Sequence, residues 1–517
     1  MLGTLWPMVH VAFPDFLDPQ KKTDAWWTAE FKKYFDNPER ANLTGLKCPT
    51  AGDDSTWDVP PYTTQSVFSK KDTYLASKTL CMRAMTVGRT QRFYDTKNLY
   101  GWSESRATQA AVQAVTGKRG AVISRSTFPS SGRYAGHWLG DNSATWLDIR
   151  TAVIGVMEFN FFGMPYVGSD VCGFRGESNE ELCLRWQQLG AFHSFFRNHN
   201  DENQPYQDPA VWPSVAAATK KANEFRYSLL PYLFSLHFGA SLRGDTVVRP
   251  LFFEFPADNA TYSISEQFMW GPQLLVAPVL YKGAQNVTAY LPDAFYSLYY
   301  INYGQRVEPG TQTFAAPTTS NTPTFVRLGA IIPRQPANIT TAATRQGNLN
   351  LLIVPDTFNS ARGELYWDDG ESILDLSTTA GYSHVSFKYQ GGNSSSLVIT
   401  TDIGNAPSIP KLAYVEIFAS TTAADHESFT LNGERLLVHK EISSHDAASN
   451  VRTVYFREPI DISEKGKCVI EWGDVVFTNS TTTVATSTPK VTTTTMAATS
   501  APLLLSIVMS FAMMAIH

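Results

Sequence analysis

The sequence has few of the features that mark nucleic-acid-binding proteins or zinc proteins. Its formal net charge is -5 and its Lys and Arg residues form no long run, so it lacks the clustered basic face that a nucleic-acid partner requires. It contains neither a C-x-x-C pair nor an H-E-x-x-H motif, which argues against a zinc site. We therefore expect no nucleic-acid partner, no metal and no cofactor.

Cysteine is also scarce, and an odd number is present. The five cysteines are Cys48, Cys81, Cys172, Cys183 and Cys468. Without a metal-binding spacing they are better explained as disulfides, with one left free or paired outside the chain. The N-x-S/T acceptor sequons begin at Asn42, Asn259, Asn286, Asn338, Asn393 and Asn479. Together these features predict a protein of the secretory pathway.

Both ends of the sequence depart from a simple secreted protein. The start has no basic n-region and no apolar h-region of a signal peptide, so we expect a segment to precede Met1. Residues 476–500 form a Ser/Thr-rich stalk, and residues 501–517 an apolar tail shorter than the ~20 residues of a spanning helix. We predict a removable GPI-attachment signal and a cell-surface location. The alternatives are a short membrane anchor or a tail without function, and a lysosomal or secreted protein.

The first half of the chain has the pattern of an α/β protein. Over residues 1–250, short apolar strands alternate with helical stretches, which predicts a (β/α)8-type barrel with its chemistry at the carboxyl ends of the strands. Ser178 and Glu181 have the spacing of a capping box at the start of one helix. The apolar spacing of residues 213–238 predicts a second, continuous helix.

The second half has the pattern of β-sandwich material. Short alternating strands separated by Pro, Gly and Asn turns predict two modules, over residues 251–345 and 346–475. The acidic stretch YWDDGES spans 366–372. Its Asp-Gly pair is typical of a hairpin turn, so we expect this acidic cluster to be a solvated turn rather than a catalytic site.

Several long motifs resemble those of one enzyme family. VISRSTFPSSGRYAGHWLGDN, FFGMPYVGSDVCGF and LCLRWQQLGAFHSFFRNHN are similar to the catalytic barrel of family 31 glycoside hydrolases, of the maltase, sucrase and lysosomal acid α-glucosidase type. WGPQLLVAPVL and GELYWDDGES are similar to the β-domains that follow that barrel. The resemblance covers roughly Pro7 to Trp472. It implies a retaining α-glucosidase that removes terminal α-linked glucose from oligosaccharides without a cofactor.

The resemblance assigns roles to particular residues. Asp141, in GHWLGD, matches the general acid/base. A carboxyl packed by tryptophans is partly desolvated, which favours the protonated form that a general acid needs. The alternative for Asp141 is a strand-end cap. Arg125 matches a residue that binds the sugar, and its alternative is an ordinary strand-end ion pair.

Four more pocket residues and two disulfides follow from the same match. Asp170 and His199 match residues that bind sugar hydroxyls, while Trp138 and Phe174 match apolar walls of the pocket; for each of these, plain packing is the alternative. The resemblance also implies the disulfides Cys172–Cys183 and Cys48–Cys81. It names no partner for Cys468.

One essential motif of the family is absent from the sequence. Retaining enzymes need a second carboxylate, the nucleophile, which the family carries in a W-I-D-M-N-E motif. Its flanking landmarks are present as VAFPDF (11–16) and KCPT (47–50), but no W-x-D-M-N lies between them. The nearby Asp53, Asp54 and Asp58 lack a preceding strand and are poor substitutes.

We therefore expect an incomplete barrel in this chain. Its causes include a larger parent product, an inaccurate gene model or a splice form. A non-catalytic surface protein that binds carbohydrate or another partner is the alternative function.

Overall fold

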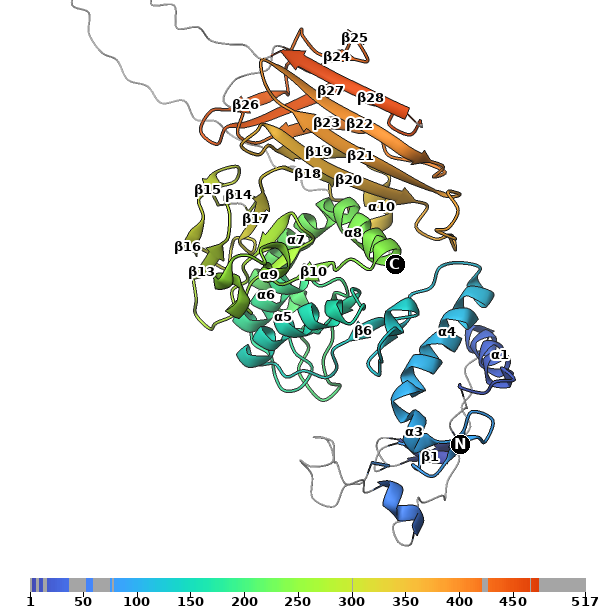
Figure 1. Cartoon of the computed structure of the whole chain (residues 1–517). Coiled ribbons are helices and arrows are strands. Elements are labelled where there is room, and N and C mark those ends of the chain that lie inside the picture. The colour runs from blue at the N-terminus through green and yellow to red at the C-terminus, as the bar shows by residue number, and fades with distance from the viewer. Residues whose placement is uncertain are drawn as a thin grey trace, which may run out of the picture. The chain divides into compact units, whose positions relative to one another are not determined.

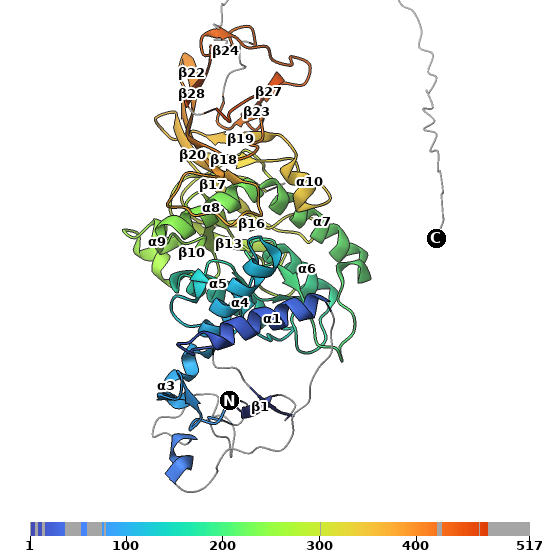
Figure 2. The same ribbon diagram turned by 90° about the vertical axis from the view of Figure 1, so that its right-hand side faces the viewer.

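The computed structural model describes residues 2–5, 9–12, 16–36, 53–58, 75–76, 79–299, 301–420, 426–464 and 466–473. A small hairpin, β1 (Leu2–Leu5) with β2 (Val9–Ala12), opens the chain. Helix α1 (Lys22–Asp36) then lies alongside α4 (Tyr100–Thr116) in both views (Figure 1 and Figure 2). The indole of Trp27 on α1 donates a hydrogen bond to Thr108 on α4, at 2.9 Å. The short elements between these helices are η1 (Asp53–Asp58), β3 (Met85–Thr86), β4 (Gln91–Arg92), α3 (Phe93–Thr96) and η2 (Lys97–Leu99).

The next segment alternates strands and helices, as the sequence predicts. Strands β5 (Ile123–Ser124), β6 (Gly136–Trp138) and β7 (Val167–Gly168) form a parallel three-stranded sheet, and β8 (Asp170–Val171) pairs in parallel with β9 (Arg197–Asn198). Parallel strands require crossover connections, and helices supply them. The helices are α5 (Trp146–Phe161), α6 (Glu180–Gly190), α7 (Pro213–Ser228) and α8 (Leu230–Arg243), with η3 (Ser131–Arg133) and η4 (Pro209–Val211) between them.

The predicted capping box of α6 is wrong by one residue. The N-cap is Asn179, whose side chain accepts a hydrogen bond from the Leu182 amide at 3.1 Å. Ser178 is buried, and the Glu181 carboxylate instead accepts a hydrogen bond from the Gly283 amide. Asn caps a helix as well as Ser does, and Glu181 is needed elsewhere to bind the neighbouring β-segment.

The predicted single helix over residues 213–238 is two helices. Helix α7 ends at Ser228, and α8 starts at Leu230, with Pro231 in its first turn. Proline has no amide hydrogen to continue the ladder and its ring clashes with the preceding turn, so the helix breaks there. The apolar periodicity continues across the break, and periodicity alone therefore missed it.

Two sheets follow the barrel segment. A six-stranded sheet has the order β10-β11-β12-β17-β14-β15, and β13 pairs with β16 beside it. Their bounds are β10 (Val248–Arg249), β11 (Phe268–Trp270), β12 (Leu274–Val276), β13 (Asn286–Leu291), β14 (Phe295–Ser297), β15 (Arg306–Val307), β16 (Gly310–Ala315) and β17 (Thr324–Arg327), with α9 (Leu251–Glu254) and η5 (Asn259–Ser263) between. Trp186 of α6 and Trp270 of β11 belong to one buried apolar cluster, so this sheet shares its core with the barrel segment.

An eleven-stranded sheet makes up the rest of the described chain. Its order is β25-β24-β28-β22-β21-β20-β18-β19-β23-β27-β26. Its members are β18 (Ala330–Arg334), β19 (Leu349–Val354), β20 (Ser360–Asp368), β21 (Tyr382–Gln390), β22 (Ser394–Gly404), β23 (Leu412–Ile417), β24 (Thr430–Leu431), β25 (Glu434–Arg435), β26 (Ser444–Asp446), β27 (Val451–Ile460) and β28 (Gly466–Gly473), with α10 (Thr341–Arg345) between β18 and β19. Burial alternates along β22, so one face of this strand packs inward.

The acidic stretch at the end of β20 is not a solvated turn throughout, contrary to our expectation. Asp368 is fully buried and binds Arg119, from the loop before β5, through both guanidinium nitrogens at 2.7 and 3.0 Å. Tyr366 and the Gly370 amide donate further hydrogen bonds to the same carboxylate, at 2.6 and 2.7 Å. Asp369, the next residue, is exposed. Sequence adjacency could not separate the two, because the partner of Asp368 lies 249 residues away.

Four of the predicted sequons can be placed in the structure. The sequon asparagines that are described, Asn259, Asn286, Asn338 and Asn393, are all exposed, whereas Asn42 and Asn479 lie outside the described residues. No helix in the described part of the chain is long and apolar enough to cross a membrane. The predicted stalk and tail, residues 476–517, also lie outside the described residues.

Candidate active site

Asp141 stands just past the carboxyl end of β6, where a barrel enzyme carries its chemistry. Gly140, before it, has φ +90°, and a β-carbon there would lie 3.1 Å from the side chain of Arg125. Glycine therefore lets the chain turn tightly against that arginine. The Asp141 carboxylate is 3.4 Å from Arg175, whose side chain is 65% exposed. A long, exposed ion pair of this kind holds the carboxylate weakly and leaves it accessible.

Asp170 has the opposite environment. It is fully buried at the start of β8, and its Oδ1 accepts hydrogen bonds from the Trp138 indole at 2.8 Å and from Arg197 at 2.5 Å. Its Oδ2 is buried and has no hydrogen-bond partner among the described residues. Burial raises the pKa of Asp170, while Arg197, His199 and the Trp138 hydrogen bond act against that rise. A buried carboxylate oxygen without a donor is costly, and it marks a place where a ligand hydroxyl could bind.

Aromatic rings lie close to Asp170. The His199 ring lies 5.1 Å from that of Phe174, nearly parallel, and 6.5 Å from that of Trp138, edge to face. The guanidiniums of Arg197 and Arg125 lie 5.1 and 6.0 Å from the Trp138 ring. The structure thus brings Arg125, Trp138, Asp170, Phe174 and His199 into one connected cluster.

Backbone hydrogen bonds join the loop of Asp141 to this cluster. The carbonyl of Asn142 accepts hydrogen bonds from the amides of Phe174 and Arg175, both at 2.9 Å. The Asn142 side chain donates to the Asp170 carbonyl at 3.1 Å. Asp141 therefore sits on a loop fixed to the loop that follows β8, although its own side chain stays accessible.

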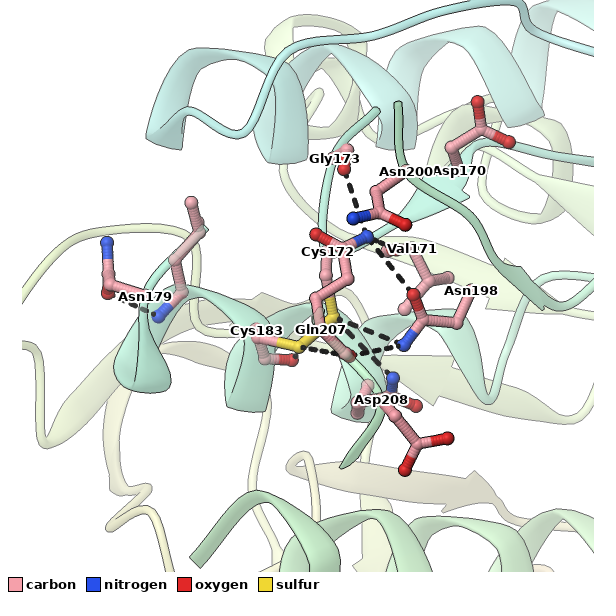
Figure 3. Close-up of a disulfide and its surroundings, with 12 residues drawn as sticks. Asp170, Val171, Cys172, Gly173, Asn179, Cys183, Asn198, Asn200, Gln207 and Asp208 are labelled. Atoms are coloured by element: carbon pink, nitrogen blue, oxygen red, sulfur yellow. Dashed lines mark hydrogen bonds between the residues drawn. A yellow bond between two sulfur atoms is a disulfide. The ribbon is translucent and has the colours of Figure 1, made fainter. Parts of the chain in front are cut away.

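A disulfide fixes the other side of the same loop. Cys172 and Cys183 are joined, which ties the turn after β8 to the first turns of α6 (Figure 3). Cys172 has φ +74°, an unusual conformation for a residue with a side chain. Cys81 is also disulfide-bonded, but Cys48 lies outside the described residues, so its pairing stays a prediction. Cys468 is free and partly buried.

Sequence reasoning missed two arginines of this site. Arg197 binds Asp170, and Arg175 contacts Asp141. Arg197 could have been found, because it lies two residues before His199 and alternate residues of a strand face the same way. Arg175 gave no such signal, since it lies in a turn whose direction the sequence does not define.

The expected position of the nucleophile lies outside the described residues, since residues 37–52 are not described. Of the three aspartates that follow, Asp58 is buried and accepts a hydrogen bond from the Ala76 amide at 3.0 Å. Burial raises its pKa. Asp58 thus has a structural role in its own loop.

Comparison with known protein families places most of this chain in one family. The family model described as the glycosyl hydrolases family 31 TIM-barrel domain matches residues 1–236, and that of the glycosyl hydrolase family 31 C-terminal domain matches residues 244–332. The fold is therefore a TIM-barrel domain followed by C-terminal β-domains, as the sequence predicts. The predicted loss of a barrel strand concerns residues 37–52, which lie outside the described residues, so it stays a prediction.

Curated relatives agree with this assignment. The chain is 36% identical to the human protein named probable maltase-glucoamylase 2 over 448 residues, which cover 83% of this chain and 18% of that protein. It is 36% identical to human intestinal sucrase-isomaltase over 483 residues, 88% of this chain and 26% of that protein. It is 38% identical to rat lysosomal alpha-glucosidase over 424 residues, 75% of this chain and 42% of that protein. The chain thus spans less than half the length of these relatives.

Solved structures show the same fold at lower identity. A glucosidase II alpha subunit is 22% identical with a TM-score of 0.73, covering 92% of this chain and 50% of that one. A GH31 dextranase from Flavobacterium johnsoniae is 20% identical with a TM-score of 0.72, covering 91% of this chain and 57% of that one. From its motifs, its fold and its relatives, this chain belongs to glycosyl hydrolase family 31, a family of glycoside hydrolases.

Proposed function

We propose that this chain carries the sugar subsite and the proton donor of a retaining α-glucosidase that removes terminal α-linked glucose from oligosaccharides. The buried and unpaired Oδ2 of Asp170 carries the proposal. It faces no donor from the described protein, and a sugar hydroxyl would supply one. The rings of Trp138, Phe174 and His199 add the apolar surface on which a sugar ring packs.

Asp141 is the proton donor in this proposal. Its carboxylate is partly exposed, and its only partner among the described residues is Arg175 at 3.4 Å. In a retaining reaction this group first protonates the leaving oxygen and then activates water, while a second carboxylate attacks the anomeric carbon.

Replacing Asp141 by Asn in the full chain tests the assignment. Turnover of maltose should fall by about 10²–10⁴-fold, the usual contribution of a general acid. Turnover of an α-glucoside with an acidic phenol leaving group should fall less in its first step, because that leaving group needs no proton. Equal losses on both substrates would contradict the assignment of Asp141 as the acid.

The missing W-x-D-M-N motif favours a second function, a surface protein that binds α-glucosides without cleaving them. The two functions differ in one experiment on the full chain. A nucleophile-trapping fluoroglucoside should label an Asp or Glu of this chain if the chain is an enzyme. Binding of an unreactive α-glucoside without labelling or turnover would support the binding protein instead.

The same proposal includes attachment to the cell surface. The exposed sequon asparagines agree with passage through the secretory pathway, and the Ser/Thr-rich stretch before the apolar tail has the order of a GPI signal. A phosphatidylinositol-specific phospholipase should release the protein from intact cells. Retention after that treatment, with release of a known GPI-anchored protein in the same sample, would exclude the lipid anchor.

A further inference from the structure

Gln207 lies next to the candidate site, in the loop between β9 and η4. It is 4% exposed, although it is a polar residue in a surface connection. Its Nε2 lies 3.1–3.3 Å from four oxygens. They are the carbonyls of Val171, Gly173 and His199 and the side-chain oxygen of Asn198.

These four acceptors belong to the two segments that carry the pocket residues. Val171 and Gly173 lie on the turn between Asp170 and Phe174, and Asn198 and His199 lie at the end of β9. An amide has only two hydrogens, so Gln207 shares two donors among the four acceptors. Its side chain therefore bridges β8 and β9 just past the point where their own pairing ends.

The backbone of Gln207 reinforces this bridge. Its carbonyl accepts a hydrogen bond from the Asn198 side chain at 2.9 Å. Figure 3 shows the Gln207 side chain beside the Cys172–Cys183 disulfide, between Gly173 and Asn198. The disulfide fixes the β8 turn to α6, but it does not reach β9. Gln207 and Asn198 therefore add side-chain links between the two segments to the β8–β9 pairing, the Asp170–Arg197 ion pair and the hydrogen bond from the Asp201 amide to the Phe174 carbonyl.

The position of His199 depends on this connection. Its ring stacks on Phe174, which follows the β8 turn, while its own carbonyl is one of the Gln207 acceptors. Without the Nε2 donor, the buried carbonyls of Val171 and Gly173 and the partly buried carbonyl of His199 would each lose a hydrogen-bond partner. The turn at Cys172 and Gly173, both at positive φ, would then have one restraint fewer.

We propose that Gln207 is a positioning residue that sets the spacing of the Asp170–Phe174 and Arg197–His199 segments and thereby the affinity of the pocket for sugar. The inference rests on the proposed function. Gln207 does not touch the sugar in this account; it acts through the backbone of the two segments that do.

Three variants of the full chain test this inference. Gln207→Met keeps the length of the side chain and removes both donors. Gln207→Glu places a carboxylate against four oxygen acceptors, and it regains one donor when it is protonated. Gln204→Met is the matched control, because Gln204 lies in the same loop and its side chain makes no hydrogen bond among the described residues.

The first readout is the affinity for methyl 1-thio-α-glucoside, an unreactive sugar, measured by calorimetry relative to the parent at each pH. At pH 7, Gln207→Met and Gln207→Glu should bind about tenfold more weakly, and Gln204→Met as tightly as the parent. At pH 5, Gln207→Glu should recover toward the parent, and Gln207→Met should not. Parent-like affinity of Gln207→Met, or no recovery of Gln207→Glu, would overturn the inference.

The second readout does not depend on sugar binding. Amide hydrogen exchange in Gln207→Met should speed up in residues 170–174 and in residues 197–201, relative to Gln204→Met. If the parent binds no sugar, the proposed function fails and this readout alone decides the inference: acceleration in one segment only, or in neither, overturns it. If Gln207→Met does not fold, Gln207→Glu takes its place, with exchange rates corrected for pH.

Discussion

Two fully buried aspartates of this protein each bind an arginine, and they differ in one respect. Asp368 uses both carboxylate oxygens: Arg119 binds both, Tyr366 donates to one and the Gly370 amide to the other. Asp170 uses only Oδ1, with Trp138 and Arg197, and its Oδ2 has no partner among the described residues. The arginine side chains are similarly exposed, at 32% and 37%.

On the proposed function, this difference separates a structural carboxylate from one kept for a ligand. When both oxygens of a buried carboxylate accept hydrogen bonds, these bonds offset the free-energy cost of removing the charge from water and stabilise the contact between the two segments. When one oxygen accepts none, the cost is offset less completely. The pKa of Asp170, which is raised first by burial, agrees with this. Burial and an arginine partner do not distinguish Asp170 from Asp368, whereas the unpaired Oδ2 does. Because Asp58 also has a buried Oδ2 without a partner among the described residues, Asp170 is singled out only by that oxygen together with the Trp138, Phe174 and His199 rings beside it.

The largest expected effect is on sugar binding. Asp170→Asn replaces either Oδ2 or Oδ1 by an amide group that donates hydrogen bonds. It also removes the negative charge that binds Arg197. Affinity for an unreactive α-glucoside should fall about a hundredfold, which corresponds to about 2.7 kcal/mol. Asp368→Asn should leave that affinity within about threefold of the parent. Calorimetry of both variants checks the contrast, and equal losses would remove the distinction between the two aspartates.

For the free energy of unfolding, we expect a large effect at Asp368. Asp368→Asn should lower the free energy of unfolding by about 2 kcal/mol, because it leaves Arg119 without its charged partner. Asp369→Asn is the matched control: that residue is exposed and binds only its own turn, through Ser372 and neighbouring amides. Its effect should stay within about 0.5 kcal/mol. Urea unfolding measures both, and a smaller loss for Asp368→Asn than for Asp369→Asn would contradict the structural role of Asp368.

The smallest expected effect is on how the free energy of unfolding depends on pH. Because burial raises the folded-state pKa of Asp170 above the ordinary value of 3.8 for an aspartate, the folded state holds this proton to a higher pH than the unfolded state does. The contribution of Asp170 to stability is therefore most favourable at low pH, and it declines as the pH rises from about 3.8 through the raised pKa. Relative to the parent, Asp170→Asn should gain stability over that window and then stay level. A relative loss with rising pH would show that Arg197 over-compensates the burial.

The sequence predicted that these residues lie near one another, for a physical reason. Trp138 ends β6, Asp170 lies just past β7 and His199 just past β9, and the carboxyl ends of parallel strands meet at the same end of a barrel. Long motifs fixed those strands in order. The closeness of Trp138, Asp170 and His199 in the structure follows from that strand order. Their roles in binding sugar stay proposals.

The remainder could not be read from local sequence. Arg119 and Asp368 meet across 249 residues, and no local pattern at YWDDGES distinguishes its first aspartate from its second. The helix break at Leu229 follows from one proline inside an unbroken apolar period. Arg175 and Gln207 act from irregular loops, whose course depends on contacts that form only in the folded chain.

The most direct test of the account is a crystal structure of the full chain with an unreactive α-glucoside, read at Asp170. A sugar hydroxyl should lie within about 3 Å of Oδ2, with the Trp138 and Arg197 hydrogen bonds to Oδ1 retained. A sugar bound elsewhere, with Oδ2 hydrogen-bonded to a protein group, would contradict it.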